Sequence, residues 1–154
     1  MSAGVTRGAI YHHYRSKAGL FAAVAARLQS EVADAVAAAA DSASAEPREQ
    51  LRVGCHEFLD AITSAARVRV LLVDGPAVVG WAEWRRLDAE NSMVHLREAL
   101  DAAGVGVDIL DATTVLLSGA MNEAALWVAE QRDDAEARRQ AHRVLDRLLA
   151  VAAG

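Results

Sequence analysis

The chain has 154 residues, of which 53% are hydrophobic and 24% are charged, with a net charge of −5, and these values exclude a disordered chain and favour one globular body. No uncharged apolar run reaches the length of a membrane-spanning helix, and no long apolar signal core stands at the N-terminus, so we expect a cytoplasmic protein without a membrane partner. Cys55 is the only cysteine, which excludes an internal disulfide bond and a zinc site built from several cysteines.

The charge is distributed unevenly along the chain. Residues 1–21 carry a charge of +3 with no acidic side chain, whereas the remaining residues carry −8. We therefore expect the two parts to meet different partners. Much of the hydrophobic content is alanine, which favours helix, and no segment alternates as a strand does. The predicted fold class is all-α, with helices joined by short turns.

The first half of the chain predicts three helices. A short helix has Thr6 as its N-cap and runs to about His13, and a second has Ser16 as its N-cap and continues toward Ala40. Pro47 suits the first position of the next helix, where its missing N–H is not needed. The apolar residues of that helix recur at helical spacing: Leu51, Cys55, Phe58, Leu59 and Ile62.

The second half of the chain predicts four more helices. A short one covers residues 68–73 and ends at Asp74-Gly75-Pro76. A long one covers residues 81–103 and ends at Gly104. The last two run from Asp108 or Asp111 to Gln131, and from Asp133 or Asp134 to about Ala152. Their short connection predicts an antiparallel pair.

Residues 4–17 read Gly-Val-Thr-Arg-Gly-Ala-Ile-Tyr-His-His-Tyr-Arg-Ser-Lys and have the chemistry of the second half of a DNA-reading helix-turn-helix. Hydroxyl and basic side chains suit phosphate, an arginine is free to read guanine, and Gly8 lets the backbone approach DNA. Ile10 and Tyr14 supply apolar contacts to the following helix. The residues predicted to contact DNA are Thr6, Arg7, Gly8, Tyr11, His12, His13 and Lys17.

This segment, followed by Leu20-Phe21, resembles the signature of the TetR family of bacterial repressors. The resemblance implies a remnant of the helix-turn-helix DNA-binding domain at residues 1–24. It also implies a helical ligand-binding and dimerisation domain at residues 25–154. Family members carry a first helix and a full second helix before this turn, and only Ser2-Ala3 stand there in this sequence. We therefore expect weak DNA binding by this chain, because its short recognition helix lacks packing partners.

The resemblance implies a pocket for a small effector. Trp81, Trp84, Asp88, Asn91 and His95 lie on one helical face, which mixes aromatic area with polar groups as ligand pockets do. The alternative is that the tryptophans pack in the core and the three polar residues meet solvent. Asn122 interrupts an apolar run and is the best polar candidate, with a subunit interface or solvent as the alternative. The predicted lining of a pocket for a small apolar effector is Cys55, Phe58, Leu59, Ile62, Trp81, Trp84, Asn91, Met121 and Asn122.

The last two helices carry stripes of small and apolar residues that predict a tightly packed four-helix seam between two chains. Two-fold operator DNA requires a two-fold protein, which favours this homodimer. The alternative is that the stripes are buried only against their own chain. The predicted interface residues are Gly119, Ala120, Ala124, Trp127, Ala141, Leu145, Leu148 and Ala152.

No catalytic, cofactor or metal site is predicted. Cys55-His56-Glu57 has the residue types of a triad, but consecutive residues of a helix point in different directions. His56 and Asp60 share a helical face, yet two ligands are too few for a metal site. The resemblance implies a ligand-responsive repressor, not an enzyme, with operator DNA, a small effector and a second copy as partners. The alternatives are a ligand-binding and dimerisation module that does not bind DNA, and then an all-helical enzyme.

Overall fold

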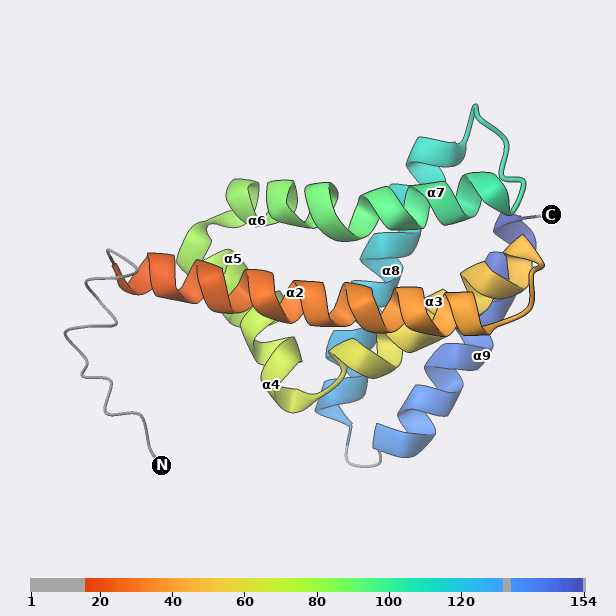
Figure 1. The fold of residues 1–154 in the computed structure, drawn as a ribbon. Coiled ribbons are helices and arrows are strands. Elements are labelled where there is room, and N and C mark those ends of the chain that lie inside the picture. The colour runs from red at the N-terminus through yellow and green to blue at the C-terminus, as the bar shows by residue number, and fades with distance from the viewer. Residues whose placement is uncertain (1–15, 132–133, 154) are drawn as a thin grey trace.

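The computed structural model describes residues 16–131 and 134–153, and all regular elements within them are helices, which confirms the all-α prediction (Figure 1). The elements are α2 (Lys17–Ser42), α3 (Pro47–Ile62), α4 (Ala65–Arg67), η1 (Val68–Asp74), α5 (Gly75–Val79), α6 (Trp81–Asp88), η2 (Ala89–Met93), α7 (Val94–Ala102), α8 (Leu110–Glu130) and α9 (Asp134–Ala152). The η segments are π-helical, with wider turns than an α-helix. The helix predicted for residues 6–13 lies outside the described residues.

Helices α2 and α3 begin where the sequence predicts. The Ser16 side chain caps α2 by accepting a hydrogen bond from the backbone N–H of Gly19 at 3.0 Å. Pro47 opens α3, and the carboxylate of Glu46 caps it. The two helices pack against each other along much of their length (Figure 1). Because α2 is one continuous helix, the predicted boundary between residues 24 and 25 falls inside it.

The prediction that a helix ends at Asp74-Gly75-Pro76 is wrong. The helical path continues through η1 into α5 and ends at Gly80. The φ of Gly80 is 88°, which suits a residue without a side chain. Pro76 lies in the first turn of α5, where its missing N–H is least needed. The π-helical segment η1 leads directly into α5, so the helical path continues through the proline.

The long helix predicted for residues 81–103 is present, but it is divided. The elements α6, η2 and α7 follow one helical path, and it runs beside α2 (Figure 1). The path ends at Gly104, which has a φ of 93° as expected of a helix-terminating glycine. The π-helical interruption at η2 was not predicted, because the spacing of apolar residues does not reveal one.

The final pair, α8 and α9, has the predicted order and an antiparallel arrangement (Figure 1). Neither Asp108 nor Asp111 caps α8, whose first residue is Leu110 and which has no side-chain cap. Asp111 instead lies in the first turn, where an acid is favourable, and accepts a hydrogen bond from Arg97 Nε at 2.7 Å.

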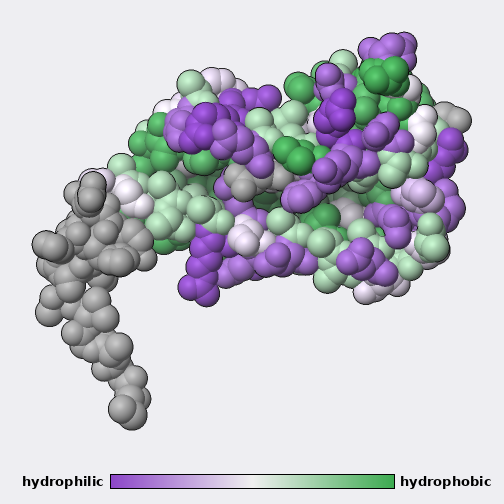
Figure 2. Space-filling view, turned by 45° about the horizontal axis from the view of Figure 1, so that its top comes forward, coloured by the Kyte–Doolittle hydropathy of each residue, from purple (hydrophilic) through white to green (hydrophobic). Residues whose placement is uncertain are grey.

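Two apolar clusters form the core of the bundle. The first joins α3, α7, α8 and α9 through fully buried leucines such as Leu100 and Leu110. The second joins α3, η1 and α8 through Leu59, Leu71 and Ala125. Outside the core, apolar and charged residues alternate in small patches on the face seen in Figure 2. Among the described helices, none is both long and apolar enough to cross a membrane.

Candidate functional site

The larger of two neighbouring cavities lies between α2, α3, α7 and α8 and has a volume of about 450 Å³. Its larger apolar lining residues are Val32, Val36, Leu51, Cys55, Phe58, Leu96 and Met121. The polar residues that line it are Asp34, Gln50, Ser92, His95 and Ser118. A mostly apolar cavity of this size with a few polar groups has the properties of a site for a small organic molecule.

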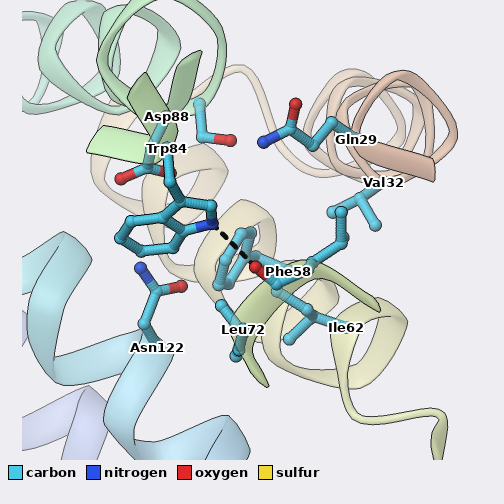
Figure 3. A pocket seen from close by; sticks show the side chains of 10 residues that line it. Gln29, Val32, Phe58, Ile62, Leu72, Trp84, Asp88 and Asn122 are labelled. Atoms are coloured by element: carbon cyan, nitrogen blue, oxygen red, sulfur yellow. Dashed lines mark hydrogen bonds between the residues drawn. The ribbon is translucent and has the colours of Figure 1, made fainter. Parts of the chain in front are cut away.

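A second cavity, of about 20 Å³, adjoins the first and shares Val32, Phe58 and Ser92 with it. This volume accommodates one water-sized group. Side chains from several elements converge on it, as Figure 3 shows. Its polar lining residues are Gln29 from α2, Asp88 from α6, Ser92 from η2 and Asn122 from α8. We call this space the small cavity and its neighbour the large cavity.

Asp88 is the unusual residue of the small cavity. It is only 7% exposed, and its Oδ2 has no hydrogen-bond partner among the described residues. Its ion pair with Arg85 is long, at 3.8 Å between Nη1 and Oδ2. Burial raises the pKa of Asp88 above its ordinary value, and the charge of Arg85 lowers it only in part. A buried and incompletely paired carboxylate costs stability, and such groups gather at functional sites.

Trp84 forms one wall of the small cavity and is fixed in place. Its Nε1–H donates a hydrogen bond to the backbone oxygen of Leu71 at 2.7 Å, drawn as the dashed line in Figure 3. Gly75 lies against the indole, since a Cβ there would stand 3.1 Å from Trp84 Cδ1. Leu72 belongs to η1 and Ser92 to η2, so each π-helical segment contributes to this lining. Such segments are rare, and they occur frequently at functional sites.

The residues predicted to line a pocket fall into two groups. Those that border one or both cavities are Cys55, Phe58, Ile62, Trp84, Met121 and Asn122. Leu59 does not, because it is 1% exposed and packs in the core. Trp81 does not either, because it is 65% exposed and stacks on the far side of Trp84 with 5.2 Å between ring centroids. The side chain of Asn91 lies outside the described part of the chain.

The contribution of α2 to both cavities was not predicted. Its lining residues include several alanines, and alanine is compatible with any face of a helix. The signal that could have found this face was the i, i+4 spacing of Val32 and Val36 within the alanine-rich tract. Asp88 did carry a signal, because it stands four residues after Trp84 on the face that the sequence singled out. Sequence reasoning took its alternative place to be solvent, whereas the structure buries it.

The Cys55 thiol has little nucleophilic character. It is 4% exposed at the edge of the large cavity, and burial raises its pKa to about 12. A thiol with that pKa stays protonated at neutral pH, and the thiolate is the reactive form. His56 is directed to α9, where its Nε2 lies 2.7 Å from Asp146 Oδ1, and therefore does not serve as a base for Cys55.

Helices α3 and α9 are fastened by a reciprocal polar cluster that the sequence reasoning missed. Each carries an arginine, a histidine and an aspartate at four-residue intervals: Arg52, His56 and Asp60 on α3, and Arg138, His142 and Asp146 on α9. The histidine of each helix faces the aspartate of the other, at 2.7 Å for His56 with Asp146 and 3.1 Å for His142 with Asp60. The signal was present as the same Arg-x3-His-x3-Asp spacing in both helices.

The two imidazole rings of this cluster stack on each other, with 4.2 Å between centroids and 12° between planes. Burial lowers the pKa of His142, and the neighbouring His56 lowers it further, while Asp60 acts in the opposite direction. Among the described residues, no group of three or more His, Cys, Asp or Glu side chains is arranged to hold a metal ion. We interpret the cluster as a structural contact, made of a hydrogen bond and ion pairs, that holds α3 against α9.

The outer surfaces of α8 and α9 expose apolar side chains. Leu116 is 73% exposed and Val151 is 83% exposed. Of the predicted interface residues, Gly119, Ala120, Trp127 and Leu148 are exposed, and Ala124, Ala141 and Ala152 are partly buried. Leu145 corrects the predicted stripe, because it is buried in the core of its own chain. The exposed apolar stripe of α9 instead consists of Val144, Leu148 and Val151.

The residues predicted to contact DNA at positions 6–13 lie outside the described residues. Lys17 is described only in its backbone, as the first residue of α2. The helix that follows the predicted DNA segment is thus the same helix that lines both cavities, because α2 contributes Gln29 and Val32 to them.

Comparisons with known proteins agree with this architecture. Residues 48–151 match the family described as "Tetracyclin repressor-like, C-terminal domain", and residues 2–24 match "Bacterial regulatory proteins, tetR family". The structure is similar to that of a TetR-family transcriptional regulator from Pectobacterium atrosepticum, with 29% identity and a TM-score of 0.75, over 96% of this chain and 77% of the other. No curated protein matches the chain.

Proposed function

The chain belongs to the TetR family of bacterial transcriptional regulators, and from this premise we propose that it is a repressor that binds operator DNA as a homodimer and releases it when a small apolar molecule binds. The observation that carries the proposal is the large cavity in the middle of the bundle. Its volume of about 450 Å³ and its apolar lining suit an organic effector. Cytoplasmic location is part of the same proposal, since the operator is there.

Coupling between effector and DNA is proposed to run through α2. This helix begins at Lys17, directly after the predicted DNA-reading segment, and its residues Val32 and Val36 line the large cavity. An effector that prefers one position of α2 over another changes the population of the DNA-binding arrangement. The expected size of such a coupling is about 1–3 kcal/mol, which corresponds to an affinity change of roughly 5- to 150-fold.

The homodimer is proposed to form through α8 and α9. Their outer surfaces expose Leu116, Trp127, Val144, Leu148 and Val151, and exposed apolar area of this kind marks a site of association. Gly119 and Ala120 lie among them on α8, and small residues allow two helices to approach closely. The same surface on both chains gives the two-fold symmetry that a two-fold operator requires.

The test is binding of a labelled DNA fragment from the promoter of the chain's own gene, over a series of salt concentrations and with or without 1-decanol. The proposal expects sequence-preferring binding that is reduced by the alcohol and weakened by salt. The binding is expected to be weak even at low salt, because the short recognition helix predicted for this chain lacks packing partners. Binding of the alcohol without any binding of DNA contradicts the repressor. That result would support the alternative, a ligand-binding and dimerisation module that does not bind DNA. The cavity and the exposed apolar surfaces of α8 and α9 suit such a module.

A further inference from the structure

The small cavity is bordered by a carboxylate that the bundle itself neutralises only in part. Asp88 is nine-tenths buried, its Oδ2 lacks a hydrogen-bond partner among the described residues, and it borders a space the size of one small polar group. Arg85 is the cation paired with it, but at 3.8 Å the two groups are not hydrogen-bonded. A site with these properties is complementary to a donor that carries positive charge.

The other residues around the small cavity fit the same kind of group. Gln29, Ser92 and Asn122 each offer an oxygen that accepts a hydrogen bond, and no Lys or Arg is among the residues that line the cavity in the described part of the chain. An ammonium group has three donor hydrogens and no acceptor, so it uses acceptors only. The N–H of Trp84 is already bonded to the backbone oxygen of Leu71, so it does not donate to Asp88 or compete with the ligand's ammonium group.

The large cavity provides room for the rest of such a molecule. It shares Val32, Phe58 and Ser92 with the small cavity, so a ligand with its head beside Asp88 continues into apolar surroundings. Leu51, Leu96 and Met121 line that continuation, and its two ionisable lining residues, Asp34 and His95, are exposed to solvent. The combination of a charged, water-sized head site and an apolar chamber defines a single class of ligand.

We propose that the effector is an amphipathic amine, whose ammonium group pairs with Asp88 in the small cavity and whose hydrocarbon part fills the large cavity. The ligand supplies the hydrogen bond that Asp88 Oδ2 lacks in the free protein and adds its positive charge to that of Arg85. An acid of the same chain length is excluded by repulsion from Asp88, and an alcohol binds by its apolar part alone. This inference rests on the proposed function, because it names the ligand of the same pocket.

The experiment compares decylamine with 1-decanol, which share a ten-carbon chain and differ in the head group. Binding of both to the full chain is measured by isothermal titration calorimetry at pH 7.5 and checked by the shift in melting temperature. Three proteins are compared: the wild type, Asp88→Asn, and Asp41→Asn. Asp41 is an exposed carboxylate of α2 that lines neither cavity, so this control removes the same charge from the protein and leaves the ligand site unchanged.

The proposal expects the wild type and Asp41→Asn to bind decylamine about 10-fold or more tightly than 1-decanol, which corresponds to one charge-assisted hydrogen bond. Asp88→Asn is expected to lose this preference and to keep its affinity for 1-decanol. An unchanged preference in Asp88→Asn, or its loss in Asp41→Asn, overturns the proposal while the pocket for apolar molecules stands. Failure of the wild type to bind either compound instead overturns the proposed function on which the inference rests.

Discussion

The free protein should become more stable when Asp88 is replaced by asparagine. Asp88→Asn keeps the shape of the side chain but removes a carboxylate that is 7% exposed and incompletely paired. A buried polar group without its hydrogen bond costs about 1–3 kcal/mol, and the ion pair with Arg85 at 3.8 Å offsets part of that cost. We therefore expect the free energy of unfolding to rise by about 1 kcal/mol at pH 7.5, equivalent to roughly 2–4 °C in Tm for a chain of this length.

The sign of the pH dependence provides an internal control for this prediction. The pKa of Asp88 is raised above its ordinary value of 3.8, so its contribution to stability is present when the carboxyl is protonated and is lost as pH rises through the folded-state pKa. The advantage of Asp88→Asn should therefore be largest at pH 7.5 and shrink as the pH approaches 4. Urea unfolding of both proteins across this range measures it. A variant less stable than wild type by about 1 kcal/mol at pH 7.5 would refute the reasoning, because it would mean that the carboxylate is well satisfied.

Three further predictions concern other parts of the molecule. The double variant Leu116→Glu, Val151→Glu should be monomeric in size-exclusion chromatography with light scattering. The control Val73→Glu, on the exposed side of η1, should remain dimeric. The same oligomeric state in both variants would contradict the α8–α9 interface. Asp146→Asn should lower the free energy of unfolding by about 1 kcal/mol, because Asp146 is hydrogen-bonded to His56 at 2.7 Å. Asp60→Asn should lower it by less, because His142 lies 3.1 Å from Asp60 without hydrogen-bond geometry. The reverse order of the two variants in urea unfolding would contradict this interpretation of the cluster. Gly75→Ala should displace the indole of Trp84, because the added Cβ would stand 3.1 Å from both Trp84 Cδ1 and the backbone oxygen of Val70. The free energy of unfolding should fall by about 1–3 kcal/mol, and the tryptophan fluorescence spectrum should change. An unchanged spectrum and an unchanged free energy of unfolding would show that α5 moves away at no cost.

The helices were predictable where local chemistry sets their ends. Ser16 and Pro47 determine the starts of α2 and α3, and Gly104 ends α7, because capping and positive φ are properties of single residues. Pro76 misled the prediction, because it lies in the first turn of α5, where a missing N–H is tolerated, and η1 leads directly into that helix. The residues before the proline pack in the core through Leu71, which is a tertiary contact that local sequence does not reveal.

The candidate site was only partly predictable, for a similar reason. Spacing placed Trp84 and Asp88 on one face, and apolar periodicity placed Cys55 and Phe58 on another, but it did not show that α2 would close the space between them. Burial decides the role of Asp88, and burial depends on how several helices meet. The cross-helix pairing of His56 with Asp146 is likewise a relation between two segments that are 90 residues apart in the chain.

The most direct test of a ligand pocket inside the bundle is an NMR titration of protein labelled with 13C in the methionine methyl groups. Met121 is 6% exposed and lines the large cavity, whereas Met93 lies in η2 and lines neither cavity, and Met121→Leu assigns the peak. The account predicts that the Met121 methyl signal shifts on addition of 1-decanol and saturates at the Kd found by calorimetry. A Met121 signal that stays unchanged while the alcohol binds to saturation would contradict it.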